Sequence, residues 1–141
     1  MFKIGIISDE VSSSLVEAVK WAIENEVSNF ELRTVDGPYI HLITLEQAKA
    51  AAHILKQNGI TVNCLASSFG KCNLFDANEV KQQFNNLEAL VERAKIFETP
   101  VIRAFAGWRY RDIPASWPGI KDFFSKALEI LPDGYGAGRR K

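Results

Sequence analysis

Short apolar runs alternate along this chain with longer segments of helical periodicity, and this alternation restricts the possible folds more than any other feature. The apolar runs predict four strands, at 2–8, 29–34, 60–66 and 101–106. Apolar residues spaced three or four apart predict four helices, beginning near residues 14, 44, 76 and 120. A strict strand–helix order is typical of a parallel sheet with right-handed crossovers.

The expected helix ends carry local signals. Ser14 to Glu17 and Thr44 to Gln47 have the spacing of capping boxes, in which a hydroxyl and a carboxyl or amide group satisfy free backbone N–H groups. Gly59 is expected to end the second helix in the left-handed conformation. The third helix is expected to end near Glu98 and the fourth near residue 131, before Pro132.

Polar residues at alternate strand positions favour a (β/α) barrel over a doubly wound sheet, whose strands are apolar on both faces. The turn after the first strand, residues 9–14, lacks the glycines of a nucleotide-binding loop. The Gly-x-Gly sequence at 134–138 has no helix after it. We therefore expect a domain of residues 1–131 followed by a flexible tail, 132–141.

Composition narrows the function classes. The 141 residues, 47% of them hydrophobic, suffice for one domain with a core. Seventeen basic and seventeen acidic residues cancel, which argues against nucleic acid or an anionic membrane as a partner. No apolar run approaches the roughly 20 residues that span a bilayer, and no leader is recognisable, so we expect a cytosolic protein.

The side chains with metal affinity are few. Cys64 and Cys72 are expected to be reduced thiols, because two cysteines form neither a disulfide framework nor a zinc site. His41 lies before the second helix and His53 within it, and two histidines do not supply the three or so ligands of a catalytic metal site. The residues themselves therefore predict no metal site.

Glu31 and Arg33 are the most unusual residues of the second strand. Side chains alternate along a strand, so this pair shares one face while Phe30 and Leu32 share the other. We expect the apolar pair to contact helices and the charged pair to point toward the barrel axis. Ligands of such barrels bind at the carboxyl ends of the strands.

Arg103 is expected to point inward from the fourth strand. An unpaired guanidinium inside a barrel is unfavourable, and two interpretations stay open. Glu31, Arg33 and Arg103 form a buried ion-pair network that only supports the barrel, or one arginine faces a polyol, a sugar phosphate or a carboxylate.

Further candidates follow the ends of the strands. Alternation allows only one of Asp9 and Glu10 to point inward; Glu10 is taken as the candidate ligand contact, and the choice stays open. Ser67 ends the third strand and either contacts ligand or serves in capping and loop solvation. Trp108 follows the fourth strand and either stacks on a sugar ring or plugs the barrel mouth.

Four stretches, in this order and at these spacings, resemble the first half of a known family: FKIGIISDE, FELRTVDG, GITVNCLASSFGKCNL and ERAKIFETPVIRAFAGWR. The family is the sugar phosphate isomerase/epimerase family, the xylose isomerase-like TIM barrel group that also includes AP endonuclease family 2 (endonuclease IV-type) enzymes. The resemblance covers residues 1–109. It implies that this α/β chain is a parallel (β/α)4 half of a TIM barrel.

The resemblance also implies chemistry. Family members move a proton next to a sugar carbonyl, with paired glutamates as acid and base and a divalent Mn, Mg, Co or Zn ion that polarises the carbonyl. Their metal ligands come from later strands, so none is carried onto this chain and its catalytic residues stay unassigned. The endonuclease branch uses histidines on early strands, which are missing here, so DNA repair is not expected. The candidate substrate contacts are Glu10, Glu31, Arg33, Ser67, Arg103 and Trp108.

Half a barrel has two unpaired edge strands and an open inner face, which favours a covering partner. We expect two copies to close an eight-stranded ring about a two-fold axis, as a homodimer. The alternative is a monomer whose last helix and tail fold over the open face. The function is then either that of an isomerase or epimerase acting on a sugar or sugar phosphate, or that of a non-catalytic half-barrel that at most binds a small polar ligand.

Overall fold

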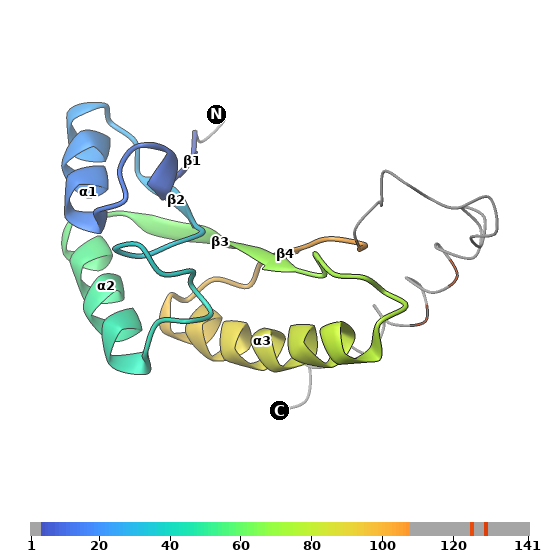
Figure 1. Cartoon of the computed structure of the whole chain (residues 1–141). Helices are drawn as coiled ribbons and strands as arrows, with labels where there is room; N and C mark the ends of the chain where they lie inside the picture. The colour runs from blue at the N-terminus through green and yellow to red at the C-terminus, as the bar shows by residue number, and fades with distance from the viewer. Residues whose placement is uncertain (1–3, 108–124, 126–128, 130–141) are drawn as a thin grey trace. The chain divides into compact units, whose positions relative to one another are not determined.

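The computed structural model describes residues 4–107 together with Ser125 and Glu129, and it shows an α/β fold. Within this part a four-stranded, all-parallel sheet has the order β1-β2-β3-β4 (Figure 1). The strands are β1 (Ile6–Ile7), β2 (Asn29–Leu32), β3 (Thr61–Phe69) and β4 (Ile102–Ala104), and the helices are α1 (Leu15–Glu24), α2 (Leu45–Gln57) and α3 (Ala77–Ile96). The predicted parallel α/β order is confirmed. No helix of the described residues is long and apolar enough to cross a bilayer.

All four strands differ in length from the prediction, since β2 ends at Leu32 and not at residue 34, and β4 covers Ile102–Ala104 and not 101–106. The first strand is reduced to Ile6–Ile7, because Ser8–Glu10 forms a short 3-10 helix, η1. The third strand runs three residues further than expected, to Phe69. Of the predicted last helix, only Ser125 and Glu129 belong to the described residues, and both are helical. Trp108 and the predicted tail, 132–141, lie outside them.

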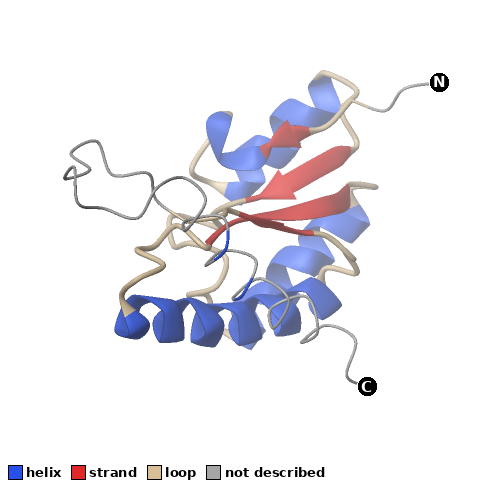
Figure 2. Cartoon of the chain, turned by 90° about the vertical axis from the view of Figure 1, so that its right-hand side faces the viewer, coloured by secondary structure: helices blue, strands red, loops and turns tan. Residues whose placement is uncertain are grey.

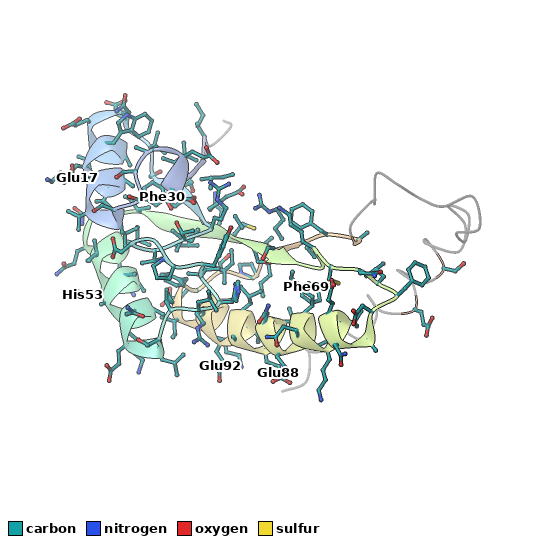
Figure 3. All side chains as sticks on the ribbon, viewed as in Figure 1. Glu17, Phe30, His53, Phe69, Glu88 and Glu92 are labelled. Atoms are coloured by element: carbon teal, nitrogen blue, oxygen red, sulfur yellow. The ribbon has the colours of Figure 1, made fainter. Side chains whose placement is uncertain are left out.

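The contacts of the chain define two compact units. The first comprises the chain up to Ser67 and residues 89–103, and the second comprises Ser68–Glu88 and the chain from Ala104. In the first unit, α1 and α2 lie against one face of the sheet (Figure 2). Phe30, which Figure 3 labels, and Leu32 are fully buried, whereas the alternating Glu31 is only half-buried. The expected alternation is therefore observed at residues 30–32, while Asn29, on the same face as Glu31, is also buried.

Pairing between β2 and β3 contains an irregularity at the charged residue. Phe30 is paired with Val62 but Glu31 with Cys64, so β3 contributes one extra residue at this point. Asn63, the extra residue, is exposed. The bulge puts Cys64 beside Glu31 in the sheet.

The helices α1, α2 and α3 all end in the same hydrogen-bonded turn. In each, the second residue beyond the helix is left-handed: Glu26 with φ 57°, Gly59 with φ 69° and Glu98 with φ 55°. The 6→1 bonds are Val27 N–H to Ala22 O, Ile60 N–H to Leu55 O and Thr99 N–H to Ala94 O. These are Schellman motifs, and the prediction for Gly59 is confirmed. The two glutamates occupy a conformation that glycine adopts at lower cost.

The two predicted capping boxes have different outcomes. Thr44 and Gln47 form the complete box at α2, with bonds of 3.1 and 2.8 Å. The box predicted at Ser14 is wrong, because the Ser14 side chain makes no capping bond. Instead Asp36, from the loop after β2, accepts a hydrogen bond from the Leu15 N–H at 2.9 Å. A residue 21 positions away therefore caps α1, which no local pattern could indicate.

The second unit is organised around Gly70, where the chain leaves β3. Gly70 has φ +83°, and an added Cβ would overlap the carbonyl of Phe105. Its N–H donates to Gln83 Oε1 at 2.9 Å, and the Phe105 N–H donates to Phe69 O at 2.8 Å. Glycine is required here both by the positive φ and by the close approach of the two backbones.

Replacing Asp36, which caps α1, should lower the free energy of unfolding more than replacing Ser14, whose side chain makes no capping bond. Asp36→Ala is expected to lower the free energy of unfolding by about 1–2 kcal/mol, because it removes the acceptor and places alanine at φ 50°. Asp36→Asn retains an oxygen acceptor and tolerates positive φ, so most of the stability should remain. Ser14→Ala should change the free energy by less than about 0.5 kcal/mol. Urea unfolding followed by circular dichroism measures all three, and equal losses for Ser14→Ala and Asp36→Ala would contradict this assignment.

Candidate functional site

Arg33 is held between two carboxylates at the carboxyl ends of β1 and β2. Its Nε donates to Asp9 Oδ2 at 2.8 Å, and its Nη2 donates to Glu10 Oε1 at 2.7 Å. The side chain of Asp9 is 11% exposed, that of Arg33 34% and that of Glu10 62%. These hydrogen bonds, that of Asp9 first, raise the pKa of Arg33. We call Asp9, Glu10 and Arg33 the carboxyl-end cluster.

Both acids reach Arg33 because they do not lie on a strand. Alternation along an extended strand would have allowed only one of them to point inward. The 3-10 helix Ser8–Glu10 replaces the strand at this point, and successive side chains of a helix do not alternate between two faces. The alternation expected of an extended strand therefore does not apply at these two residues, of which Asp9 is nearly buried and Glu10 is mostly exposed.

Asp9 has one carboxylate oxygen that the fold does not satisfy. Oδ1 is buried and has no hydrogen-bond partner among the described residues, whereas Oδ2 is bound to Arg33. Buried polar atoms in proteins almost always have a partner, and leaving one unpaired costs about 1–3 kcal/mol. Oδ1 is therefore an unsatisfied acceptor beneath the surface, and a further donor could reach it only if the side chains that cover it moved.

Glu31 lies on the sheet face opposite the buried Phe30 and Leu32, and it is aligned with Ile7 of β1 and Cys64 of β3. Its carboxylate makes no hydrogen bond or ion pair with the residues that the structure describes. Burial, and then the negative charge of Glu31, raise the pKa of the Cys64 thiol. The sheet register, which pairs Glu31 with Cys64, accounts for this effect.

Arg103 and Ser67 are joined to each other across β3 and β4. The Ser67 hydroxyl donates to the Arg103 carbonyl at 2.6 Å, and the Arg103 Nη2 donates to Ala66 O at 2.9 Å. Ser67 is only 2% exposed. The predicted network therefore does not form as proposed, since Arg33 is bound to Asp9 and Glu10 and makes no bond to Glu31.

The histidines lie apart from this cluster. His41 stacks on Tyr39 with ring centroids 5.9 Å apart, and burial followed by the charge of Arg93 lowers its pKa. His53 is exposed on α2. Among the described residues, no three His, Cys, Asp or Glu side chains are arranged to hold a metal ion. The described donor set therefore does not fit the divalent metal that the family resemblance implies.

The structure brings together some of the predicted contacts and leaves others apart. Glu10 and Arg33 are in direct contact, and Ser67 and Arg103 form a second pair. Trp108 lies outside the described residues. Sequence reasoning considered Asp9 but did not select it, and the signal that could have done so is the run Ser8-Asp9-Glu10, which is polar where an apolar strand would continue.

The reactivity of Cys64 should report on Glu31. In a Cys72→Ser background, the rate of alkylation by iodoacetamide is expected to rise at higher pH than for an ordinary thiol, because only the thiolate reacts. Glu31→Gln removes a negative charge and should shift the rate curve to lower pH. Since folding raises this pKa, the associated stability is present below the pKa of the unfolded thiol and is lost as the pH rises through the folded pKa.

A matched control for this measurement is Glu79→Gln. Glu79 raises the pKa of Cys72 and is not among the groups that shift Cys64, so its replacement should leave the Cys64 rate curve unchanged. If Glu31→Gln also leaves the Cys64 rate curve where it was, the carboxylate is not near the thiol and this assignment is wrong.

Comparison with known protein families, with curated proteins and with solved structures finds no match to this chain.

Proposed function

We propose that this chain is a (β/α)4 half-barrel related to the sugar phosphate isomerase/epimerase barrels, and that it binds a small polyhydroxylated ligand at the carboxyl-end cluster. The observation that carries the proposal is the buried Asp9 Oδ1, which has no donor among the described residues although Oδ2 is held by Arg33. A ligand hydroxyl could supply that donor once the side chains that cover Oδ1 move aside, and the Glu10 carboxylate beside it is already exposed. The cluster follows the carboxyl ends of parallel strands, where α/β sheets bind ligands.

The chemistry of the cluster suits a sugar better than an apolar molecule. Arg33 binds the two carboxylates through Nε and Nη2, so their orientation is set before a ligand arrives. Ionised carboxylates only accept hydrogen bonds, and adjacent sugar hydroxyls supply several donors at once. Asp9 and Glu10 together offer acceptors at the carboxyl ends of the strands.

Charge favours a neutral sugar over a sugar phosphate. Within the carboxyl-end cluster two carboxylates, those of Asp9 and Glu10, stand against the guanidinium of Arg33, whose Nε and Nη2 are already bound. A phosphate would meet net negative charge, and like charges brought together on binding cost affinity. The ligand class that we propose is therefore an uncharged sugar or polyol.

We propose binding without assigning a reaction to this chain. Metal-assisted proton transfer next to a sugar carbonyl is the chemistry that the resemblance implies, but the described side chains include no set that fits the metal. We therefore do not propose that this chain transfers a proton. Isomerase or epimerase turnover that appears with added Mn²⁺ or Mg²⁺ and is lost with EDTA would contradict the non-catalytic proposal.

Binding can be measured with D-fructose and D-fructose 6-phosphate. Titration followed by NMR should shift the backbone amides of Asp9, Glu10 and Arg33, with the phosphate ester bound about tenfold more weakly. Asp9→Asn should weaken fructose binding by about tenfold, because it replaces an ionised acceptor. Lys20→Gln, an exposed change on α1, is the control and should have no effect. Shifts confined to other regions, or tighter binding of the phosphate, would contradict the proposed ligand class.

We also propose that two copies close the barrel. β1 and β4 are the outer strands of the described sheet, and each is preceded by an exposed β-branched residue, Ile4 at 74% and Val101 at 48% exposure. Outer strands offer unpaired backbone groups to another strand. In a two-fold ring, β1 of one copy would lie parallel to β4 of the other, and the two exposed residues would be covered together.

The dimer can be tested by sedimentation equilibrium. We expect a mass of twice the 15.8 kDa of the chain, and we expect Ile4→Lys and Val101→Lys each to shift it toward the monomer. Ile23→Lys is the matched control, since Ile23 is 55% exposed but lies on α1. A wild-type chain that is folded and monomeric at micromolar concentration would rule out closure by a second copy.

A further inference from the structure

A cavity of about 390 Å³ lies at the end of the sheet opposite the carboxyl-end cluster, within the first unit. It is formed by the last turns of α2, the first residues of β3 and the end of α3. Its volume is in the range of pockets that hold small molecules. Neither the fold nor the proposed sugar site makes use of it.

The floor of the cavity is apolar. Leu55, Ile60, Val62 and Phe97 line it and are between 1% and 6% exposed. These side chains are fixed by the packing of α2 and α3 on the sheet, so the floor exists before any ligand binds. An apolar group of a ligand would be removed from water there, at about 25 cal/mol for each Å² buried.

The rim carries one charge of each sign. Lys56 Nζ and Glu98 Oε1 are 3.7 Å apart, and their side chains are 80% and 78% exposed. An ion pair this long and this exposed contributes little to stability. Breaking this pair costs little, so each of the two groups can bind an opposite charge of a ligand instead.

Two of the left-handed residues that end helices lie at this rim. Gly59 and Glu98 both line the cavity, and both have the left-handed conformation that ends α2 and α3. Glycine at residue 59 adopts it without strain, whereas glutamate at residue 98 does so at a cost. Glu26 ends α1 in the same conformation without lining the cavity, so the feature specific to this rim is the Glu98 carboxylate 3.7 Å from the ammonium group of Lys56.

We propose that this cavity binds a free apolar α-amino acid. Its side chain would occupy the floor formed by Leu55, Ile60, Val62 and Phe97. Its carboxylate would bind Lys56 and its ammonium group would bind Glu98. An apolar anion or an apolar amine would satisfy only one of the two rim charges, and a phosphate would be repelled by the carboxylate. The site is separate from the sugar site and does not depend on it.

The test uses three leucine derivatives that differ only in charge. L-Leucine has both charges, N-acetyl-L-leucine lacks the ammonium group, and L-leucinamide lacks the carboxylate. In NMR titrations of the full chain, leucine should give saturable shifts at the amides of Gly59, Thr61 and Glu98. Each derivative should bind about tenfold more weakly, because one charge-assisted hydrogen bond is lost.

Variants of the rim assign the two contacts. Lys56→Gln should weaken leucine binding about tenfold, so that leucine and leucinamide bind this variant with equal affinity. Glu98→Gln should also weaken leucine binding about tenfold, so that leucine and N-acetyl-leucine bind this variant with equal affinity. Both side chains are exposed, so both variants should fold. Lys20→Gln breaks a comparable exposed pair on α1, Lys20 with Glu17 at 2.8 Å, and should change nothing. Equal binding of the three probes, unchanged affinity in both variants, or the absence of saturable shifts at the cavity would overturn the proposal.

Discussion

The burial of apolar side chains of β2 and β3 is the interaction on which the rest of the first unit depends. Phe30 and Leu32 are completely inaccessible, and Val62 and Leu65 pair with them in the sheet. Because side chains alternate along a strand, burying these residues places Glu31 on the opposite face. A shift of one residue would bury a carboxylate and expose a phenylalanine, so the register is strongly determined.

Polar groups then gather where the strands end. Arg33 is the residue that organises them, since its planar guanidinium binds Asp9 through one nitrogen and Glu10 through another. These pairs are partly exposed, so their contribution to stability is modest. The pairs hold three side chains from two strand ends in one fixed arrangement. Within it one buried oxygen, Asp9 Oδ1, has no hydrogen-bond partner among the described residues.

The other end of the sheet, at the amino ends of the strands, has an apolar cavity in place of a polar cluster. There α2 and α3 end in Schellman motifs, whose left-handed residues turn the chain sharply toward the next strand. The two turns leave a hollow with an apolar floor and a charged rim. The same unit thus presents acceptors at the carboxyl ends of its strands and an apolar cavity at their amino ends. A polyol and an apolar amino acid would each find the chemistry that suits it at a different end.

Much of the fold follows from patterns that are local in the sequence. The order of strands and helices, the faces of β2, the Thr44–Gln47 capping box and the left-handed Gly59 depend on residues within a few positions of one another. Local geometry determines such features, so periodicity and composition suffice to predict them. The predicted box at Ser14 was wrong for a related reason. A correct local pattern is overridden when a distant group, here Asp36, provides a better-placed acceptor.

The sequence by itself determined a parallel α/β unit with charged residues on the face away from its helices. Only the tertiary structure decided how those charges pair. Arg33 binds Asp9 and Glu10, 24 and 23 residues away, and not the nearby Glu31, because the first strand gives way to a 3-10 helix that presents both acids. Likewise, the bulge at Glu31 brings Cys64 beside it, and the converging ends of α2 and α3 create the cavity. Each of these depends on which segments meet in space, and the spacing of residues along the chain carries no information about that.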